Sequence, residues 1–322
     1  MNPRENILVV RLKSIGDVLF TLPAVHALRE NFPDANITFL NSNENAPLLR
    51  GFREVNGAIA LDRTVFQSPL RAVPEILRLL RWLRREHFSL AVDFQGYGET
   101  AWLCWWSGAP ARWGNVYSGG REWLYTSGIR RDKQIHLADW NLSLLGQCGL
   151  RVGEIRNEFD LPEDALAETG KFFAENHLDP ARSTLFLQPF TSSPHKNWPL
   201  ENFLVLARHF QSHGAQIIFG GGPADRAALE PARAAGFVVS AGAPLLVSGG
   251  MTKLSRLTVG GDTGLLHLAV AMKKRVLMLM PVAGQTYPFQ HPDWAITPPP
   301  GKALAGIDTA PVIAACEQAL GS

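Results

Sequence analysis

The segment RLKSIGD, residues 11–17, carries the first residues whose types suggest chemistry. It follows an apolar run and precedes a helical pattern, which places it at the carboxyl end of a first buried strand, where open α/β sheets bind ligands. Gly16 permits a tight turn, and Asp17 at the helix start could act as a general base. Asp is also favoured at a helix start for capping and for the helix dipole alone, so a purely structural interpretation stays open.

A second glycine-rich turn occurs in VGGDTGLLH, residues 259–267, again where a helix opens. Glycines let backbone amides approach an anion, and a helix amino terminus adds a partial positive charge, so the turn suits a diphosphate. Thr263 could add a hydroxyl donor. The spacing matches neither G-x-G-x-x-G nor the Walker pattern, which argues against a nicotinamide cofactor and a P-loop ATPase. A simple capped turn is the alternative.

Two further polar residues follow predicted strands. Lys196, in TSSPHKNWP, precedes a helix and could meet a leaving phosphate as a point charge, although a solvated loop lysine would look the same. Asp225, after Gly220-Gly221-Gly222-Pro223, could accept hydrogen bonds from ribose hydroxyls or could cap its helix.

Aromatic and basic residues gather in the first half of the chain. Residues 102–123 hold five of the nine tryptophans, interleaved with Arg112 and Arg121, a composition that fits a sugar-binding or membrane-interface surface as well as core packing. Upstream, Arg78, Arg81 and Arg85 form one stripe of an amphipathic helix over residues 75–86, which could be a solvated face or could touch anionic lipid or a phosphorylated acceptor.

Composition excludes several classes of protein. At 322 residues the chain is long enough for about two domains, and its 46% apolar and 19% charged residues are typical of a folded globular protein. The net charge of +2 gives no general reason to expect nucleic acid. The three distant cysteines indicate neither a disulfide framework nor a zinc site, and His209 and His213 lack a third ligand, so we expect no metal.

The chain shows no targeting or membrane signal. The apolar run at residues 7–10 is too short for a signal-peptide core, and the stretch 265–282 is interrupted by Lys273, Lys274 and Arg275. We therefore expect a cytoplasmic protein that is soluble or peripheral to a membrane.

Alternation of apolar runs with amphipathic stretches predicts the fold class. Strands are expected at 7–12, 37–40, 58–61, 90–92, 184–187, 216–219 and 276–280. Helices are expected from residue 18 to about 32, with Pro23 near a first turn or at a kink, and at about 200–213, 224–235 and 309–320. This order predicts an α/β protein with parallel sheets.

A Pro-containing, acidic stretch at about 155–182 interrupts the alternation and is expected to be the linker between two similar domains with a cleft between them. We assign residues 1–165 to a first domain and 180–305 to a second. Residues 306–322 would form a last helix that could pack back on the first domain.

Taken in order, these segments resemble glycosyltransferase family 9, the ADP-heptose lipopolysaccharide heptosyltransferases. The likeness lies in RLKSIGDVLFTLP at 11–23, VDFQG at 92–96, the stretch 136–149, KNWP at 196–199 and GGDTGLLHLA at 260–269. The resemblance implies a GT-B fold, in which two Rossmann-like domains with parallel sheets face a central cleft. It also implies inverting, metal-independent transfer of heptose from ADP-heptose to a lipopolysaccharide inner-core acceptor, at the cytoplasmic face of the inner membrane, with no cofactor besides the nucleotide-sugar substrate.

The resemblance also implies roles for individual residues. Asp17 matches the general base and Lys196 the phosphate-binding lysine, and the two are the predicted catalytic residues. The predicted donor-binding residues are Thr191, Ser192, Asp225, Gly261, Asp262, Thr263, Gly264 and His267. The predicted acceptor-binding residues are Ser14, Gly16, Gln95 and Arg121.

One departure bears on the donor. Pro189-Phe190-Thr191 stands where the family commonly has Pro-Gly and a small residue, which places a bulky side chain where backbone approaches the donor. Two alternatives therefore remain: a GT-B glycosyltransferase that uses another nucleotide sugar, and a noncatalytic nucleotide-binding scaffold of the same fold.

Overall fold

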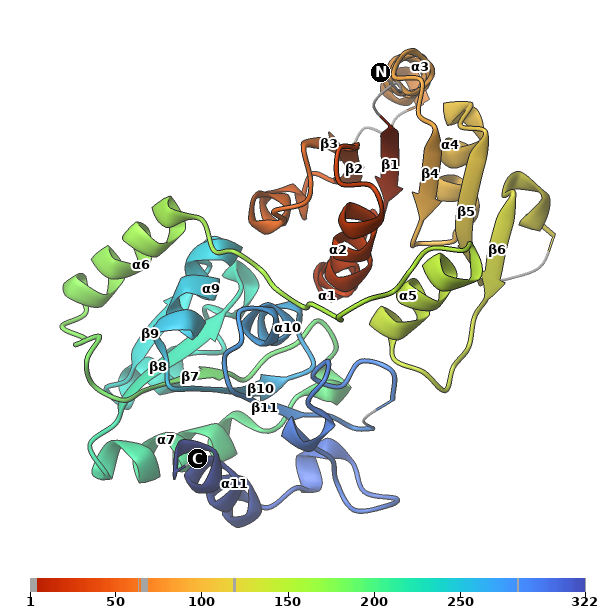
Figure 1. The fold of residues 1–322 in the computed structure, drawn as a ribbon. Helices are drawn as coiled ribbons and strands as arrows, with labels where there is room; N and C mark the ends of the chain where they lie inside the picture. Colours follow the sequence, from red (N-terminus) through yellow and green to blue (C-terminus); the bar gives the residue numbers. More distant parts are fainter. Residues whose placement is uncertain (1–4, 63, 65–68, 118–119, 283, 322) are drawn as a thin grey trace. The chain divides into compact units, whose positions relative to one another are not determined.

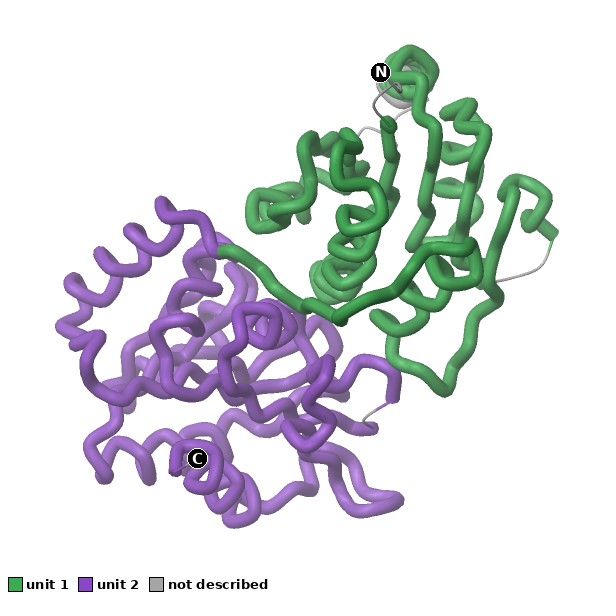
Figure 2. The backbone as a smooth tube through the Cα atoms, viewed as in Figure 1, with its two compact units in different colours: residues 1–160 green, residues 161–322 purple. Residues whose placement is uncertain are grey.

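Each half of the chain builds a parallel sheet covered by helices (Figure 1). A computed structural model describes residues 5–321 except 63, 65–68, 118–119 and 283. The chain divides into two units, residues 1–160 and 161–322 (Figure 2).

The first unit contains a sheet of six described strands in the order β3-β2-β1-β4-β5-β6, and every neighbouring pair is parallel. The strands are β1 (Asn6–Val10), β2 (Asn36–Ser42), β3 (Gly57–Leu61), β4 (Leu90–Asp93), β5 (Ala111–Val116) and β6 (Ser127–Arg130). Its helices are α1 (Ile15–Leu19), α2 (Leu22–Asn31), α3 (Pro69–Arg85), α4 (Gly98–Ser107) and α5 (Leu137–Gln147). Strands β1 and β4 are almost continuously apolar and buried, as expected for central strands covered on both faces.

The second unit repeats the design with six described strands in the order β12-β11-β10-β7-β8-β9, again all parallel. The strands are β7 (Thr184–Gln188), β8 (Gln216–Gly221), β9 (Val238–Ala241), β10 (Leu257–Gly261), β11 (Val276–Leu279) and β12 (Ala295–Ile296). The helices are α6 (Glu163–Glu175), α7 (Leu200–Ser212), α8 (Glu230–Ala234), α9 (Leu245–Leu254), α10 (Gly264–Ala271) and α11 (Thr309–Gly321). The predicted α/β class with two parallel sheets is therefore confirmed.

Proline and local capping interrupt two of the predicted helices. The helix expected from residue 18 to about 32 is two helices, because Thr21 turns the chain after α1, donating its hydroxyl to the Val18 carbonyl at 2.7 Å, and Pro23 lies in the first turn of α2. The helix expected at 224–235 is wrong as a continuous element. A short 3₁₀ turn ends at Asp225, and α8 begins only at Glu230, with Pro231 in its first turn.

Helix α6 of the second unit occupies nearly half of the stretch expected to be a linker. Helix α6 packs against α9, and the buried hydroxyl of Thr169 donates to the Val247 carbonyl at 3.1 Å. Helix α11 packs against α7, and its residues Val312, Cys316 and Ala319 lie in the core of the second unit. None of the described helices is both long and apolar enough to cross a membrane.

Candidate functional site

The turn after β1 is organised by Arg11, a buried arginine. Its Nη2 forms an ion pair with Asp17 Oδ2 at 2.7 Å, its Nε donates to the Lys13 carbonyl at 2.9 Å, and its Nη1 donates to the Phe94 carbonyl. Burial alone would lower the pKa of Arg11, but Asp17 and Tyr117 raise it and the net direction is upward. The guanidinium is thus a fixed positive charge that holds the Asp17 carboxylate.

Asp17 both caps its helix and keeps one oxygen available. Its Oδ2 accepts from the Ser14 backbone at 3.1 Å and the Ser14 hydroxyl at 3.3 Å, so the capping interpretation is correct. Its Oδ1 has no hydrogen-bond partner among the described residues. Gly16, in the same turn, is buried. A single carboxylate can therefore stabilise the start of α1 through one oxygen and accept a proton through the other.

The loop after β4 supports this turn from the neighbouring strand. Buried Gln95 accepts from the backbone N–H groups of Leu12 and Lys13 at 2.8 and 3.2 Å through its Oε1. Asp93 in turn accepts from the Gln95 N–H at 2.8 Å and from the Tyr125 hydroxyl at 2.7 Å. Burial raises the pKa of Asp93 against these hydrogen bonds. Gln95 thus positions the turn that carries Asp17 through its carbonyl oxygen, while its buried Nε2 has no partner in the described structure.

Arg121 lies on an adjoining polar cavity of about 260 Å³, together with Tyr97, Glu99 and Tyr117. Its guanidinium lies so close to Gly98 that a side chain at that position would collide with it. Tyr117 connects this cavity to the first turn, because it contacts Arg11 and also stacks under Arg131 at 5.6 Å. Three of the predicted acceptor residues therefore gather at the Asp17 turn, and Arg121 lies in the adjoining cavity that Tyr117 also lines.

In the second unit, Asp262 is the centre of a charged cluster at the end of β10. Its Oδ2 pairs with Lys196 Nζ at 3.0 Å and accepts from Thr286 Oγ1 at 3.3 Å. Its Oδ1 pairs with Nε2 of buried His267 at 3.0 Å. Burial opposes the charged form, but His267 and then Lys196 outweigh it and lower the pKa of Asp262 to about 2. The Asp262 carboxylate thus binds Lys196 Nζ and His267 Nε2, and the sequence analysis predicts that both of these residues contact the donor.

Close backbone packing explains the glycine before Asp262. A Cβ at Gly261 would lie 2.5 Å from Thr191 Cγ2 and 3.1 Å from the Lys196 carbonyl oxygen. Thr191 is itself fixed, because its N–H and hydroxyl both donate to Asn197 Oδ1 at 2.9 Å. The loops after β7 and β10 are consequently in direct contact.

The start of α10 completes this cluster. Thr263 precedes the helix, Gly264 is its first residue, and the buried Oγ1 of Thr263 has no hydrogen-bond partner in the described structure. The unpaired N–H groups of a helix start, an available hydroxyl and a nearby lysine are the groups that a diphosphate needs. Arranged in this way, the loops after β7 and β10 can bind an anion.

The other predicted donor residues lie less centrally. Asp225 Oδ2 accepts from the Gly222 N–H at 2.8 Å, so the residue caps its own turn, and its ribose contact stays a prediction. Ser192 is exposed on the loop after β7. Phe190 packs against the hydrophobic core of the second unit, so its bulk is directed at least partly into the protein.

Sequence reasoning missed the residues that hold the predicted ones in place. Arg11 stands inside the quoted segment, and its position directly after an apolar strand was the available signal. Asn197 stands inside the quoted segment KNWP, but its type alone gave it no role. Tyr117 and Thr286 lie outside the quoted motifs, and only the tertiary contacts identify them.

No group of three or more His, Cys, Asp or Glu side chains able to hold a metal occurs among the described residues. His209 Nε2 contacts Glu317 at 2.9 Å, and His213 Nδ1 lies 2.7 Å from the His209 carbonyl oxygen.

Solved structures with the same fold include a family 9 glycosyl transferase from Veillonella parvula, with a TM-score of 0.89 at 20% identity over 99% of this chain and 98% of that one. E. coli ADP-heptose LPS heptosyltransferase II has a TM-score of 0.81 at 21% identity, with 98% of each chain covered. E. coli heptosyltransferase WaaC with ADP has a TM-score of 0.78 at 19% identity, with 98% of this chain and 99% of that one covered.

Sequence comparison identifies the family. The lipopolysaccharide core heptosyltransferase OpsX of Haemophilus influenzae is 22% identical over 88% of this chain and 75% of its own length. Lipopolysaccharide heptosyltransferase 1 of Pseudomonas aeruginosa is 26% identical over 85% of this chain and 78% of its own. The model of glycosyltransferase family 9 (heptosyltransferase) matches residues 76–288, about two thirds of the chain. Because this match covers more than half of the chain, it shows that the chain is an enzyme of glycosyltransferase family 9.

Proposed function

We propose that this enzyme transfers heptose from ADP-heptose to an inner-core acceptor of lipopolysaccharide, with inversion and without a metal. The family and the names of the relatives support this class of donor and acceptor. The observation that carries the proposal is the cluster of Lys196, Asp262 and His267 beside the start of α10. It offers fixed positive charge and backbone N–H groups where a departing diphosphate would need them.

On the donor side, the proposed ligand is the diphosphate of ADP. Lys196 Nζ has three donor positions, so it can keep its contact with Asp262 and still reach a phosphate oxygen. The hydroxyl of Thr263 and the first amides of α10 would meet the same group. These contacts would stabilise the negative charge that develops as the leaving group departs, which is usually the largest contribution to catalysis.

On the acceptor side, Asp17 is the proposed base. Its Oδ1 would take the proton of an acceptor hydroxyl while that oxygen attacks the anomeric carbon of the sugar. The bond from that carbon to the diphosphate oxygen then breaks, its electron pair leaves with ADP, and the configuration at the carbon is inverted. Arg11 and Ser14 act as positioning residues, since both contact Asp17 Oδ2.

The acceptor is proposed to be lipid-linked, with its saccharide bound near Ser14, Gly16, Gln95 and Arg121. An acceptor of this kind would bring the enzyme to the cytoplasmic face of the inner membrane as a peripheral protein.

A thermal-shift panel tests the donor first. ADP, UDP, GDP, CMP and NAD are each added with and without EDTA, because a ligand that binds only the folded protein raises its apparent stability. We expect selective stabilisation by ADP that survives EDTA. Selective stabilisation by UDP or GDP would mean that the donor is a UDP-sugar or a GDP-sugar. If EDTA abolishes the stabilisation by ADP, the proposal that the enzyme works without a metal is refuted.

Turnover tests the base. With ADP-heptose and a truncated lipopolysaccharide acceptor, Asp17→Asn should lower the rate by about 10²–10⁴-fold, the usual contribution of general base catalysis. ADP should raise the melting temperature of Asp17→Asn by as much as it raises that of the wild-type protein. Normal turnover in this variant would refute the assignment, and absence of turnover in the wild-type protein with saturating substrates would favour the noncatalytic scaffold.

A further inference from the structure

The first unit carries an apolar cavity of about 510 Å³ between α3 and α4 that the proposed chemistry does not use. Its walls come from Ile76 and Leu80 of α3, from Trp102, Leu103 and Trp106 of α4, and from Leu61 at the end of β3. This volume lies within the range of about 300–1,000 Å³ that small-molecule sites occupy. Glu99 is the one charged residue among the described residues that line it.

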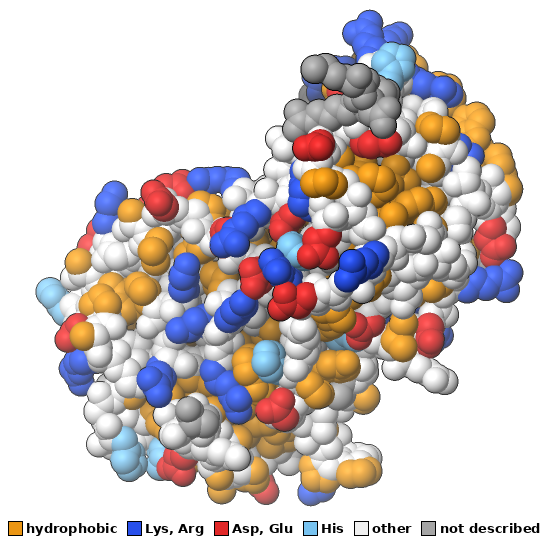
Figure 3. All heavy atoms as spheres, in the orientation of Figure 1, with side chains coloured by type: hydrophobic (Ala, Val, Ile, Leu, Met, Phe, Trp, Pro, Cys, Tyr) orange, Lys and Arg blue, Asp and Glu red, His pale blue; other side chains and the backbone are white. Residues whose placement is uncertain are grey.

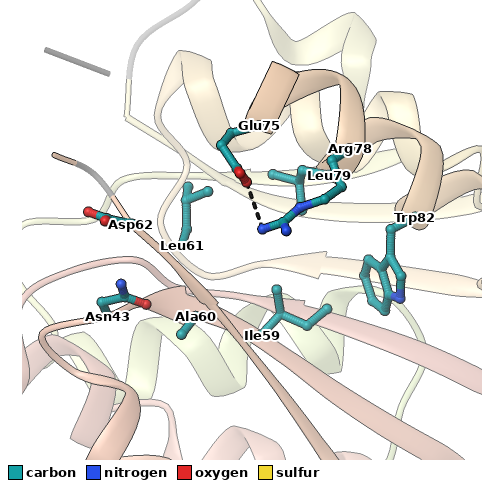
Figure 4. A pocket seen from close by; sticks show the side chains of 9 residues that line it. All are labelled: Asn43, Ile59, Ala60, Leu61, Asp62, Glu75, Arg78, Leu79 and Trp82. Carbon is teal, nitrogen blue, oxygen red and sulfur yellow. Dashed lines mark ion pairs between the residues drawn. The ribbon is translucent and has the colours of Figure 1, made fainter. Parts of the chain in front are cut away.

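A second cavity, of about 450 Å³, lies on the other side of α3, against β3 (Figure 4). Leu61 and Leu79 line both cavities, so the two adjoin along the helix. Figure 4 shows Arg78 reaching over this second cavity to pair with Glu75 at 2.7 Å. Helix α3 therefore has hollow, largely apolar surface along both sides.

Large hydrophobic side chains are exposed on and beside the helices that line this cavity. Trp102 is 47%, Trp106 40% and Trp123 61% exposed, and Val73 and Leu77 of α3 are exposed as well. The Trp102 and Trp123 rings contact each other edge to face, with their centroids 5.6 Å apart. Hydrophobic side chains also gather visibly on this unit in Figure 3. Exposed tryptophans with aliphatic neighbours are typical of surfaces that enter the interface of a bilayer.

Basic side chains accompany this apolar surface on α3. Arg81 and Arg85 are exposed and have no carboxylate partner among the described residues, and Arg84 lies over the Trp106 ring at 5.7 Å. Cations on long aliphatic stems beside a hydrophobic surface complement anionic headgroups above an acyl layer. A protein partner would explain the charge but would not need an apolar cavity of about 510 Å³.

We propose that α3 and α4 dock on an anionic lipid bilayer and that one acyl chain enters the cavity between them. Trp102, Trp106 and Trp123 would lie at the headgroup level, and Arg81 and Arg85 would contact the anionic groups. The inference rests on the proposed function only in that a lipid-linked acceptor requires a membrane. Its tests contain neither donor nor acceptor, so failure of docking and failure of sugar transfer are read separately.

Vesicle flotation of the full chain tests the docking. We expect binding to vesicles of phosphatidylcholine and phosphatidylglycerol in equal amounts, little binding to phosphatidylcholine alone, and weakening in high salt as charges are screened. Arg81→Glu with Arg85→Glu should weaken binding at least tenfold. The matched control, Arg208→Glu with Arg233→Glu on the second unit, makes the same change of net charge and should stay within twofold of the wild type.

Quenching by lipids with brominated acyl chains tests which surface enters the bilayer. Trp102→Phe with Trp106→Phe keeps aromatic rings in place and should keep vesicle binding, but should remove at least half of the quenching of tryptophan fluorescence. The control Trp294→Phe changes a buried tryptophan of the second unit and should leave the quenching intact. Undiminished quenching in the first variant, or no binding of the wild-type protein to anionic vesicles, would overturn the proposal.

Monomeric lysophosphatidylglycerol, below its critical micelle concentration, tests the cavity itself. The wild-type protein should bind it saturably, and Leu103→Trp, which fills the cavity, should weaken that binding at least tenfold without lowering the melting temperature by more than a few degrees. If the wild-type protein does not bind this lipid, or if the filled variant binds it equally well, no acyl chain enters the cavity.

Discussion

Replacing Asp262 by Asn should destabilise the second unit in a pH-dependent way. The folded protein lowers the pKa of this carboxyl from its ordinary value of 3.8 to about 2 against the cost of burial, through His267 and Lys196. At about 1.4 kcal/mol for each pKa unit, the ionised group contributes about 2 kcal/mol at neutral pH relative to its neutral form. Asn resembles that neutral form, so about 2 kcal/mol is the expected loss at pH 7.

The sign of the pH dependence follows from the direction of the shift. A depressed pKa means that the unfolded chain binds the proton more readily, so the stabilisation is complete above pH 4 and is lost as pH falls from 4 toward 2. The difference between the wild-type protein and Asp262→Asn should therefore be constant from pH 7 to pH 5 and fall to about half by pH 3.

Urea unfolding, followed by fluorescence and by circular dichroism at each pH, measures this difference. Asp225→Asn is the control, because Asp225 accepts one backbone N–H but has no cation partner among the residues that the structure describes. It should change the free energy of unfolding by less than about 0.5 kcal/mol. A loss in Asp262→Asn that is equal at pH 7 and pH 3, or smaller than about 0.5 kcal/mol at pH 7, would refute the reasoning.

Three further substitutions test other contacts. Gly261→Ala should cost about 1–3 kcal/mol in urea unfolding, because its Cβ would overlap Thr191; a stability equal to the wild type would mean that the loop yields freely. Tyr125→Phe should cost about 1–3 kcal/mol by the same measurement, since it removes a hydrogen bond to buried Asp93; no loss would show that another group replaces the hydroxyl. Lys196→Met should weaken ADP binding about tenfold or more in calorimetry, because a charge-assisted contact of about 1.5–3 kcal/mol is lost, and unchanged affinity would exclude the lysine from the site.

The sequence predicted seven of the twelve described strands and missed β5, β6, β9, β10 and β12. Central strands such as β1 and β7 are short, apolar and flanked by polar turns, and their buried faces leave a pattern that a single sequence displays. The helix expected at 224–235 failed because its apolar spacing continues across Pro231 and the capped turn at Asp225. A local interruption of this kind depends on one proline and one hydrogen bond, which periodicity does not detect.

The candidate site was predictable only in its outline. The segments around Asp17, Lys196 and Asp262 stand at strand ends, so topology alone brings Lys196 and Asp262 to the same edge of a parallel sheet. The role of each side chain depends on partners far away in the sequence. Gln95 supports the Asp17 turn across more than eighty residues, and no spacing rule connects them.

The contacts of Asp262 join two parts of the predicted donor site. Sequence analysis assigned diphosphate binding both to Lys196 and to the turn before α10, but it did not predict the contact that joins them. In the structure the Asp262 carboxylate holds Lys196 and His267 through different oxygens, so both nitrogens are fixed before a ligand arrives. A carboxylate beside a diphosphate would by itself repel it, and the lysine, the α10 dipole and the Thr263 hydroxyl must offset that repulsion. In the proposed function, Asp262 therefore acts as the residue that holds Lys196 and His267 in place rather than as a ligand of the donor.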